Sequence, residues 1–521
     1  MKPTRMLADC VGCGMSRRRF LAAGCAACAG AAGVLMAPNV ARAAQDGGKV
    51  RIRVIYSLHA VKQPSPDWPN IGFDFDPVMT RINSELAKGC PGFEFVTATA
   101  NGPEQAKKIL EEDAKANIDG YLVYQMNAWN QVVQPIASSG KPVLYADFQY
   151  GGSGGFLVYT AGFLRANAPN VGFVASSKLE HLAAAVKCFE LVKKGGSTAD
   201  FVAATARVRT ERTPKPGDLA CLPDPIAFLS ADECLRKMKE SKILAVRDQE
   251  SGPADPFIGI PVIKVPFAEV NDAWMAADKD EARAIADRWQ KTAKDIIGVP
   301  RETLEQSAAM YLGQKALLTK YGANAITINC LGGFYGGHIH AYPCLGFHEL
   351  NNEGLVGGCE CDVASTATMT AFGALTQGRP GYISDPVMDT AKRQIIYTHC
   401  VASNRAFGPQ GAANPFQILT HSEDRQGASV RSILPVGYLT TTLEVSSDRK
   451  EILFHQGKAV DNDPDDRACR TKLAAEPVGD FEKLFTEWDR WGWHRVTFYG
   501  DLKEPVFALA DALGYKVIQE A

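Results

Sequence analysis

The sequence of 521 residues lacks the features that mark several specialised classes of protein. Beyond the N-terminus, no window contains the run of about 18 apolar residues that a membrane-spanning helix needs. Neither sign of charge is in excess, because 56 Lys and Arg stand against 58 Asp and Glu, so nothing predicts a nucleic-acid partner. Hydrophobic residues make up 46%, which excludes a mostly disordered chain. The length predicts roughly three globular domains.

Cysteine is present, but it is not arranged as a disulfide framework. Four of the fourteen cysteines lie in the first 43 residues, and the others are scattered over the rest of the chain. Small disulfide-rich domains place their cysteines at short, repeated spacings, so that class is excluded. One close pair, Cys359 and Cys361, is open to two interpretations: a redox dithiol, or two buried apolar side chains, which is the commoner role of free cysteine.

The first 43 residues have the three parts of a twin-arginine export signal. Residues 16–21 read Ser-Arg-Arg-Arg-Phe-Leu, residues 21–37 are uncharged and mostly small or apolar, and residues 41–43 read Ala-Arg-Ala, a small-x-small cleavage site. We predict that residues 1–43 are a Tat signal peptide and that the protein is exported to the periplasm or beyond the cell. Because Tat cargo folds before export, the signal favours a protein that acquires a metal or cofactor in the cytosol.

The remaining chain divides into two α/β domains and a third domain of different character. In residues 44–164, and again in 165–325, short apolar segments typical of strands alternate with segments of helical periodicity. That alternation predicts βαβ units and parallel sheets. Residues 326–521 contain strand-like segments bounded by turn residues and predict an α+β domain with an antiparallel or barrel part. The glycine-rich residues 151–155 lack the Lys-Ser/Thr of a phosphate loop and predict a flexible linker or lid.

Histidines and acids concentrate in the third domain. Seven of the nine histidines lie between residues 338 and 494. If residues 359–362 are extended, Glu360 and Asp362 project from the same face and could share a divalent cation or divide acid and base roles. A solvated turn is the alternative, but the apolar residues beside these acids argue against it, because burying unpaired carboxylates is costly. His338 and His340 form a second i, i+2 pair that could supply ligands.

Short segments in the second half of the chain resemble the L-fucose isomerase-like family, which is related to the L-arabinose isomerases. The resemblance runs from about residue 243 to the C-terminus, and it rests on the order and spacing of the segments 307–315 (SAAMYLGQK), 321–330 (YGANAITINC), 352–354 (NEG), 359–362 (CECD), 397–400 (YTHC), 420–423 (THSE), 469–471 (CRT) and 492–496 (GWHRV). It implies two Rossmann-like α/β domains followed by a C-terminal domain that contains a β-barrel.

The resemblance also implies an activity and a site. Such proteins interconvert aldoses and ketoses with a divalent metal, usually manganese, while acid–base groups move a proton through an enediol. Family members often carry a metal-binding acid just after the position of Cys330, where this chain has none, and His338 or His340 could replace it. The implied roles are metal binding for Asp362, His494 and Glu360, catalysis for Glu360, Asp362 and His399, and substrate binding for His338, His340 and Arg495.

We therefore expect an exported, metal-dependent protein that acts on a small carbohydrate, most simply an aldose–ketose isomerase, and that forms a homo-oligomer. Two alternatives stay open. A non-catalytic carbohydrate-binding protein would share the two-domain α/β pattern of residues 50–325, as periplasmic binding proteins do. The second alternative is an epimerase or lyase on the same fold. The His- and acid-rich third domain favours an enzyme over a binding protein.

Overall fold

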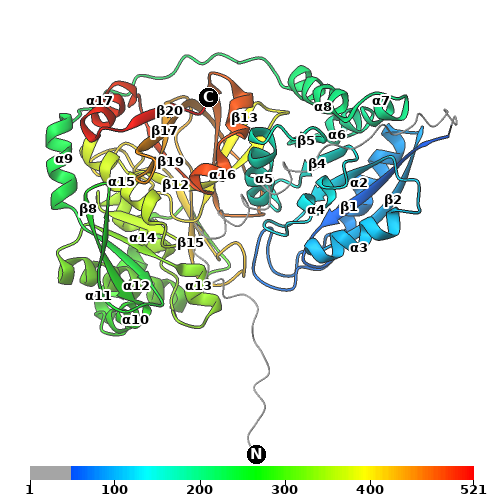
Figure 1. Cartoon of the computed structure of the whole chain (residues 1–521). Helices are drawn as coiled ribbons and strands as arrows, with labels where there is room; N and C mark the ends of the chain where they lie inside the picture. The colour runs from blue at the N-terminus through cyan, green and yellow to red at the C-terminus, as the bar shows by residue number, and fades with distance from the viewer. Residues whose placement is uncertain (1–47) are drawn as a thin grey trace, which may run out of the picture.

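The computed structural model of the protein describes residues 48–521 (Figure 1). The export signal predicted in residues 1–43 lies outside these described residues. No helix between residues 48 and 521 is long and apolar enough to cross a membrane. The described chain forms an N-terminal α/β part, a second α/β part and a C-terminal barrel.

The N-terminal part, blue to cyan in Figure 1, contains a parallel sheet in the order β2-β1-β3-β4-β5. Helices lie on both of its faces (Figure 1), so its central strands are almost wholly buried, even though β1 contains Arg51 and Arg53. The strands are β1 (Val50–Ser57), β2 (Phe93–Ala100), β3 (Gly120–Gln125), β4 (Val143–Asp147) and β5 (Val171–Val174). The helices are α2 (Asp76–Gly89), α3 (Pro103–Asp113), α4 (Val133–Ala137), α5 (Ser153–Arg165), α6 (Leu179–Val186), α7 (Phe189–Lys193) and α8 (Thr198–Arg212).

The second part contains a five-stranded sheet in the order β11-β10-β6-β8-β7, parallel except for the edge strand β7. Its strands are β6 (Ile243–Arg247), β7 (Gly252–Phe257), β8 (Ile260–Pro266), β10 (Ala325–Ile328) and β11 (Val356–Cys359). Its helices are α9 (Ala231–Glu240), α10 (Phe267–Met275), α11 (Lys279–Thr292), α12 (Arg301–Tyr321), α13 (Cys330–Tyr335), α14 (Cys344–Asn352) and α15 (Val363–Leu375). A small separate sheet joins β9 (Asp295–Ile297) to β14 (Phe416–Leu419) and β15 (Ser429–Ser432).

The C-terminal part is a six-stranded antiparallel barrel in the order β16-β19-β12-β13-β18-β17, which the pairing of β16 with β17 closes. The strands are β12 (Tyr382–Asp389), β13 (Gln394–His399), β16 (Leu439–Ser446), β17 (Glu451–Asn462), β18 (Thr471–Val478) and β19 (Arg495–Tyr499), with β20 (Lys516–Gln519) added in parallel to β17. The 3-10 helix η1 (Phe481–Phe485) and the helices α16 (Trp488–Trp491) and α17 (Lys503–Leu513) complete it. Helix α15 contacts both β11 and β16 and so connects the second sheet to the barrel.

The predicted fold class is confirmed, but the sheets do not divide where the sequence placed the domain boundaries. Strand β5 follows residue 164 and yet pairs with β4 in the first sheet. Strands β10 and β11 belong to the second sheet, and β11 lies beyond residue 325. Apolar periodicity identifies a buried strand, but it does not reveal which sheet that strand joins, because the choice depends on partners distant in the chain.

The glycines of residues 151–155 are not a flexible linker or lid, as the sequence suggested. They are buried and lead into α5, which begins at Ser153. A Cβ at Gly152 would overlap the carbonyl oxygen of Gln125, at the end of β3. Glycine is therefore required because it lets the helix start close against the sheet.

Candidate active site

Four side chains of the C-terminal half converge on one point. Glu360, Asp385, His399 and His494 each offer one ligand atom, and these atoms all lie within 4.8 Å of one another. Glu360 follows β11 at the carboxyl end of a parallel strand, where open α/β sheets bind their ligands. The other three come from the barrel: Asp385 from β12, His399 from the end of β13, and His494 from the residue before β19.

The turn that presents Glu360 differs from the extended segment considered for residues 359–362. Strand β11 ends at Cys359, and the next two residues, Glu360 and Cys361, adopt left-handed backbone conformations with φ of +60° and +52°. Such a conformation is uncommon for residues other than glycine and often marks a functional position. The turn is held by the N–H of Cys361, which donates to the carbonyl of Ile328 at 2.9 Å. Glu360 and Asp362 therefore leave the backbone on a tight turn and take different positions in the site.

Asp362 orients His494 through a short hydrogen bond. It caps the N-terminus of α15, where one carboxylate oxygen, Oδ1, accepts the N–H of Ser365 at 3.1 Å. Its other oxygen, Oδ2, lies 2.8 Å from Nδ1 of His494. Because an ionised carboxylate only accepts, the proton of the neutral imidazole is assigned to Nδ1, which leaves the lone pair of that neutral ring on Nε2.

The lone pair of His494 points at two carboxylates. Nε2 lies 3.0 Å from Oδ1 of Asp385 and 3.6 Å from Oε2 of Glu360. A histidine whose Nδ1–H donates to a carboxylate while Nε2 faces other ligand atoms is the usual arrangement at metal centres. The sequence paired Asp362 and His494 as ligands; the structure brings them into contact and places Asp362 behind the imidazole ring.

His399 has the opposite proton arrangement. Its Nδ1 accepts the backbone N–H of Cys400 at 2.9 Å, so the proton of the neutral ring is on Nε2. That atom lies 3.9 Å from Oε1 of Glu360 and 3.9 Å from Oδ2 of Asp385. His399 therefore offers a proton donor to the site, and the catalytic role expected of it stays a prediction.

The donor set fits a divalent cation. Asp385 is 3% exposed, and among residues 48–521 its ion-pair partners are the two histidines, with no lysine or arginine within 4 Å. A buried carboxylate in such a place requires a compensating positive charge. The 3.0 Å between Asp385 and His494 is also the spacing of neighbouring ligand atoms in an octahedral shell with bonds of about 2.1 Å. Two carboxylates and one imidazole nitrogen suit manganese or magnesium.

A second group of ionisable side chains lies in the loop between β14 and β15. Burial raises the pKa of Glu423 to about 8, and the charge of Glu360 adds to the rise. The Tyr335 hydroxyl donates to Glu423 at 2.9 Å. Burial lowers the pKa of His421, but the neighbouring Asp424 and other negative groups outweigh it and raise the pKa to about 9. A carboxyl group whose pKa is raised in this way suits an acid–base role, because the best catalytic pKa lies near the operating pH.

Three residues predicted to bind substrate lie elsewhere. The ring of His338 stacks on Phe267 of α10, with centroids 5.4 Å apart, and His340 lies near Trp274 of the same helix. Arg495 is fully buried, with its guanidinium 2.9 Å from Glu520 in an ion pair and stacked over Trp488. Successive residues along a strand project to opposite sides, which separates Arg495 from His494.

Sequence reasoning missed Asp385 and Glu423. Asp385 lies in β12, a strand whose eight residues are all buried, so an acid within an apolar strand was the available signal. Glu423 belongs to a segment noted only for its resemblance. The placement of Asp385 beside Glu360 depends on pairing between distant strands, which local periodicity does not predict.

An aromatic group that includes Trp493, the chain neighbour of His494, links the C-terminal part to the N-terminal part. Trp493, next to His494, makes edge contacts with Trp68 and Trp129, at centroid distances of 6.5 and 6.2 Å. Trp129 follows the carboxyl end of β3, has a left-handed φ of +67° and is 38% exposed. A Cβ on Gly154 would lie 3.2 Å from the ring of Trp129, so the glycines of α5 also make room for this loop. Aromatic faces of this kind suit the C–H faces of sugars.

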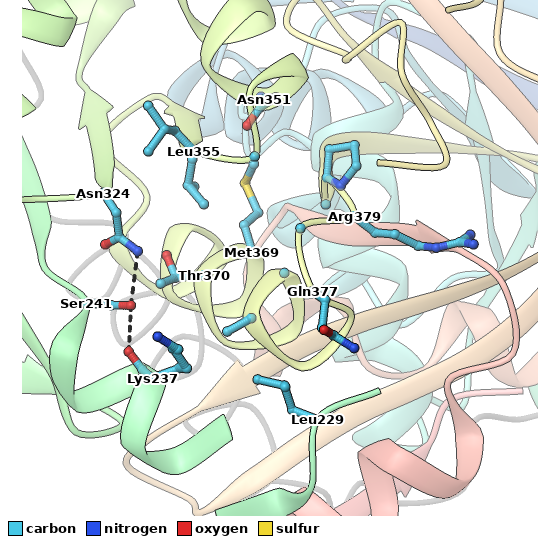
Figure 2. A pocket seen from close by; sticks show the side chains of 17 residues that line it. Leu229, Lys237, Ser241, Asn324, Asn351, Leu355, Met369, Thr370, Gln377 and Arg379 are labelled. Atoms are coloured by element: carbon cyan, nitrogen blue, oxygen red, sulfur yellow. Dashed lines mark hydrogen bonds between the residues drawn. The ribbon is translucent and has the colours of Figure 1, made fainter. Parts of the chain in front are cut away.

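A cavity of about 340 Å³ lies away from this cluster (Figure 2). It is bordered by Ser241, Asn324 and Val356, which stand at the amino ends of β6, β10 and β11. Asn324 donates to Ser241 at 3.0 Å, and Ser241 donates to the carbonyl of Lys237 at 2.8 Å, as the dashed lines in Figure 2 show. None of the four cluster residues lines it. The cluster, on the opposite, carboxyl edge of the sheet, is therefore the candidate active site.

The sequence matches no protein-family model. It is 24% identical over 306 residues to a sulfoquinovose isomerase of Clostridium sp. (strain MSTE9), which covers 55% of this chain and 66% of that protein. The sulfoquinovose isomerases of Priestia aryabhattai and Priestia megaterium (strain ATCC 12872 / QMB1551) are each 24% identical over 233 residues, 43% of this chain and 50% of theirs. The chain thus matches between half and about two thirds of the length of these distant relatives, which are sugar isomerases by name.

The solved structures that match this chain overlap with it poorly. The transcription regulator CcpA of Lactococcus lactis is 11% identical and covers 54% of this chain and 78% of its own, with a TM-score of 0.17. A sugar ABC transporter protein of Yersinia enterocolitica subsp. enterocolitica 8081 is 12% identical and covers 54% and 65%, also with a TM-score of 0.17. Overlap this low supports no argument about fold or function.

Proposed function

We propose that the protein is a metal-dependent aldose–ketose isomerase. The observation that carries the proposal is the convergence of Glu360, Asp385 and the Nε2 lone pair of His494, with the donor His399 beside them. The names of the distant relatives support the same reaction class. A binding protein without catalysis would not need buried carboxylates that demand a cation.

Glu360, Asp385 and His494 would hold the metal, which we propose to be Mn²⁺. A bound divalent cation supplies Lewis-acid stabilisation of the negative charge that develops on sugar oxygens when a neighbouring C–H bond is broken. Asp362 acts behind His494 as a positioning residue, because it fixes the tautomer that leaves Nε2 able to bind.

Isomerisation moves one proton between neighbouring carbons and another between their oxygens. We assign the carbon-bound proton to Glu423, which removes it from C2 and returns it to C1, because its pKa of about 8 permits exchange near neutral pH. We assign the oxygen-bound proton to His399, whose Nε2–H faces the cluster. Trp129 and Trp493 would border the sugar and exclude water from the reacting atoms.

The test is a sugar panel assayed with and without metal. The relatives' name indicates sulfoquinovose as the first aldose to assay, with neutral aldohexoses beside it. Ketose should form, disappear after treatment with a chelator and return when Mn²⁺ is added. Ketose formation that resists the chelator would contradict the metal site. Binding of a sugar without conversion would favour the non-catalytic carbohydrate-binding protein. Formation of an epimer or an elimination product would favour an epimerase or lyase.

We further propose that the protein is exported by the Tat pathway and forms a homo-oligomer. The export proposal rests on residues 1–43 alone. Replacing Arg17 and Arg18 with Lys should retain the protein in the cytosol, because the export receptor recognises the arginine pair. Cell fractionation tests this, and a double variant that is still cleaved and exported would contradict it. Light scattering after gel filtration gives the oligomeric state.

A further inference from the structure

Two buried thiols meet directly behind the metal-binding turn. The ten cysteines of residues 48–521 are all in the free form, and nine of them are buried. Cys330 and Cys359 are exposed by only 1% and 3%, and their sulfur atoms lie 3.3 Å apart. The two residues are 29 positions apart in the sequence, so the fold, and not a local motif, brings them together.

The sheet explains this contact. Strands β10 and β11 are parallel neighbours, with Ile328 opposite Cys359. Cys330 follows two residues after Ile328 and begins α13, so its side chain lies at the same carboxyl edge. The sequence suggested a pairing of Cys359 with Cys361. In the structure Cys359 contacts Cys330 instead, because the left-handed turn at residues 360–361 redirects the chain after Cys359.

The position of the pair gives it a role. Cys359 is bonded through the backbone to Glu360, and Glu360 supplies a carboxylate to the cluster. A covalent link from Cys359 to Cys330 would tie this turn to the end of β10. The two sulfurs need to approach from 3.3 Å to about 2.05 Å, a movement that small side-chain rotations supply.

We propose that Cys330 and Cys359 are a disulfide-forming pair that, once oxidised, restrains the turn carrying Glu360. The oxidant is a peroxide. One thiol sulfur attacks a peroxide oxygen, so that an S–O bond forms, the O–O bond breaks and one water leaves with the thiol proton. The second sulfur then attacks the sulfenic sulfur; the S–S bond forms, the S–O bond breaks, and a second water carries away the other proton. Two thiols and one hydrogen peroxide thus give one disulfide and two waters.

The experiment compares the reduced protein with protein treated with a small excess of hydrogen peroxide. After desalting, both samples are denatured, alkylated and analysed by intact mass and peptide mapping. The oxidised protein should have two fewer alkylated cysteines and a cross-linked peptide joining residues 330 and 359. Because closing a loop restrains the unfolded chain, the thermal midpoint should rise by at least about 3 °C and return after reduction.

Serine variants identify the sulfurs involved. Cys330→Ser and Cys359→Ser should each abolish both the cross-link and the rise in midpoint. Cys234→Ser is the matched control, because Cys234 is equally buried but its sulfur contacts the carbonyl of Ala371; it should behave as wild type. Mapping of the wild-type protein requires no variant to fold.

Three results would overturn the proposal. The first is an unchanged number of alkylated thiols after peroxide treatment. The second is a cross-link elsewhere, for which Cys400 and Cys469 are the obvious competitors, since Ser422 lies 4.0 and 3.9 Å from their sulfurs. The third is a disulfide at the proposed position that leaves the thermal midpoint unchanged. None of these outcomes depends on the proposed isomerase activity, so the two proposals fail separately.

Discussion

Replacing Asp362 with Asn should weaken metal binding about 10- to 100-fold while helix α15 stays capped. In the wild-type protein Oδ1 caps α15 and Oδ2 accepts the Nδ1–H of His494. If the amide oxygen of Asn keeps the cap, its NH₂ group faces Nδ1 as a donor. The proton of His494 must then move to Nε2, the atom that faces Glu360 and Asp385. A protonated Nε2 does not bind a cation.

The expected effect is large on metal binding and small on stability. Loss of a hydrogen bond that orients a metal-binding histidine typically weakens metal affinity 10- to 100-fold, about 1.4–2.7 kcal/mol. Asn and Asp cap helices about equally well, so the free energy of unfolding should fall by less than about 1 kcal/mol, mainly from the lost charge at the helix N-terminus. Asp362→Ala should add a cap loss of about 1 kcal/mol.

The assay is a calorimetric titration of the purified variant with Mn²⁺, alongside thermal unfolding. Asp278→Asn is the matched control, because Asp278 caps α11 at an exposed position by accepting the N–H groups of Asp280 and Glu281. It should show the same small change in stability and an unchanged affinity for Mn²⁺. Wild-type affinity in Asp362→Asn, with the fold intact, would refute the claim that Asp362 sets the tautomer of His494.

Two further predictions concern single carboxyl groups. Glu360→Gln should weaken Mn²⁺ binding at least about tenfold and abolish turnover, as measured by calorimetry and the sugar assay; retained metal with lost turnover would instead make Glu360 the proton-transfer group. Burial raises the pKa of Asp147 from 3.8 to about 8, although Ser153 donates to it at 2.8 Å. The pKa of Asp147 in the folded protein lies above its value in the unfolded chain. The contribution of the protonated Asp147 to the free energy of unfolding is therefore fully present below pH about 4 and is lost as the pH rises towards 8. Urea midpoints from pH 5 to 9 should therefore fall more steeply for the wild type than for Asp147→Asn, and parallel curves would refute this reading.

Local sequence pattern accounts for individual helices and strands. Pro103 is the first residue of α3, and the buried residues Leu304, Ala308 and Tyr311 of α12 recur every three or four positions. Strand β10 is a short, wholly buried run, Ala325–Ile328. In each case the information lies within one element, since apolar spacing and a first-turn proline act over a few residues.

The site was only partly predictable, because its geometry depends on distant pairing. Composition and resemblance singled out Glu360, Asp362 and His494, and the structure brings all three together. The left-handed turn at Glu360 was not foreseen, because that conformation is adopted against the preference of the residue and is held by a bond from the next residue to β10. Asp385 was missed because its neighbours in the site come from other strands.

The glycine-rich residues 151–155 show the same limit of prediction from sequence alone. Five residues rich in glycine suggest mobility when only the chain is considered, yet residues 151–155 are buried against β3 and the loop of Trp129. Glycine there supplies space and not flexibility. That distinction requires the neighbouring backbone, which no local pattern contains.

One measurement tests the central claim most directly: proton NMR of an aldose incubated in D₂O with the Mn²⁺-loaded protein, with sulfoquinovose as the first substrate. Proton transfer through an enediol exposes the moving hydrogen to exchange with solvent. The account therefore predicts ketose that carries deuterium on the carbon next to the carbonyl, and no product from Glu360→Gln. Ketose without deuterium would indicate a hydride shift, and the absence of any product from the whole sugar panel with metal bound would contradict the assignment as an isomerase.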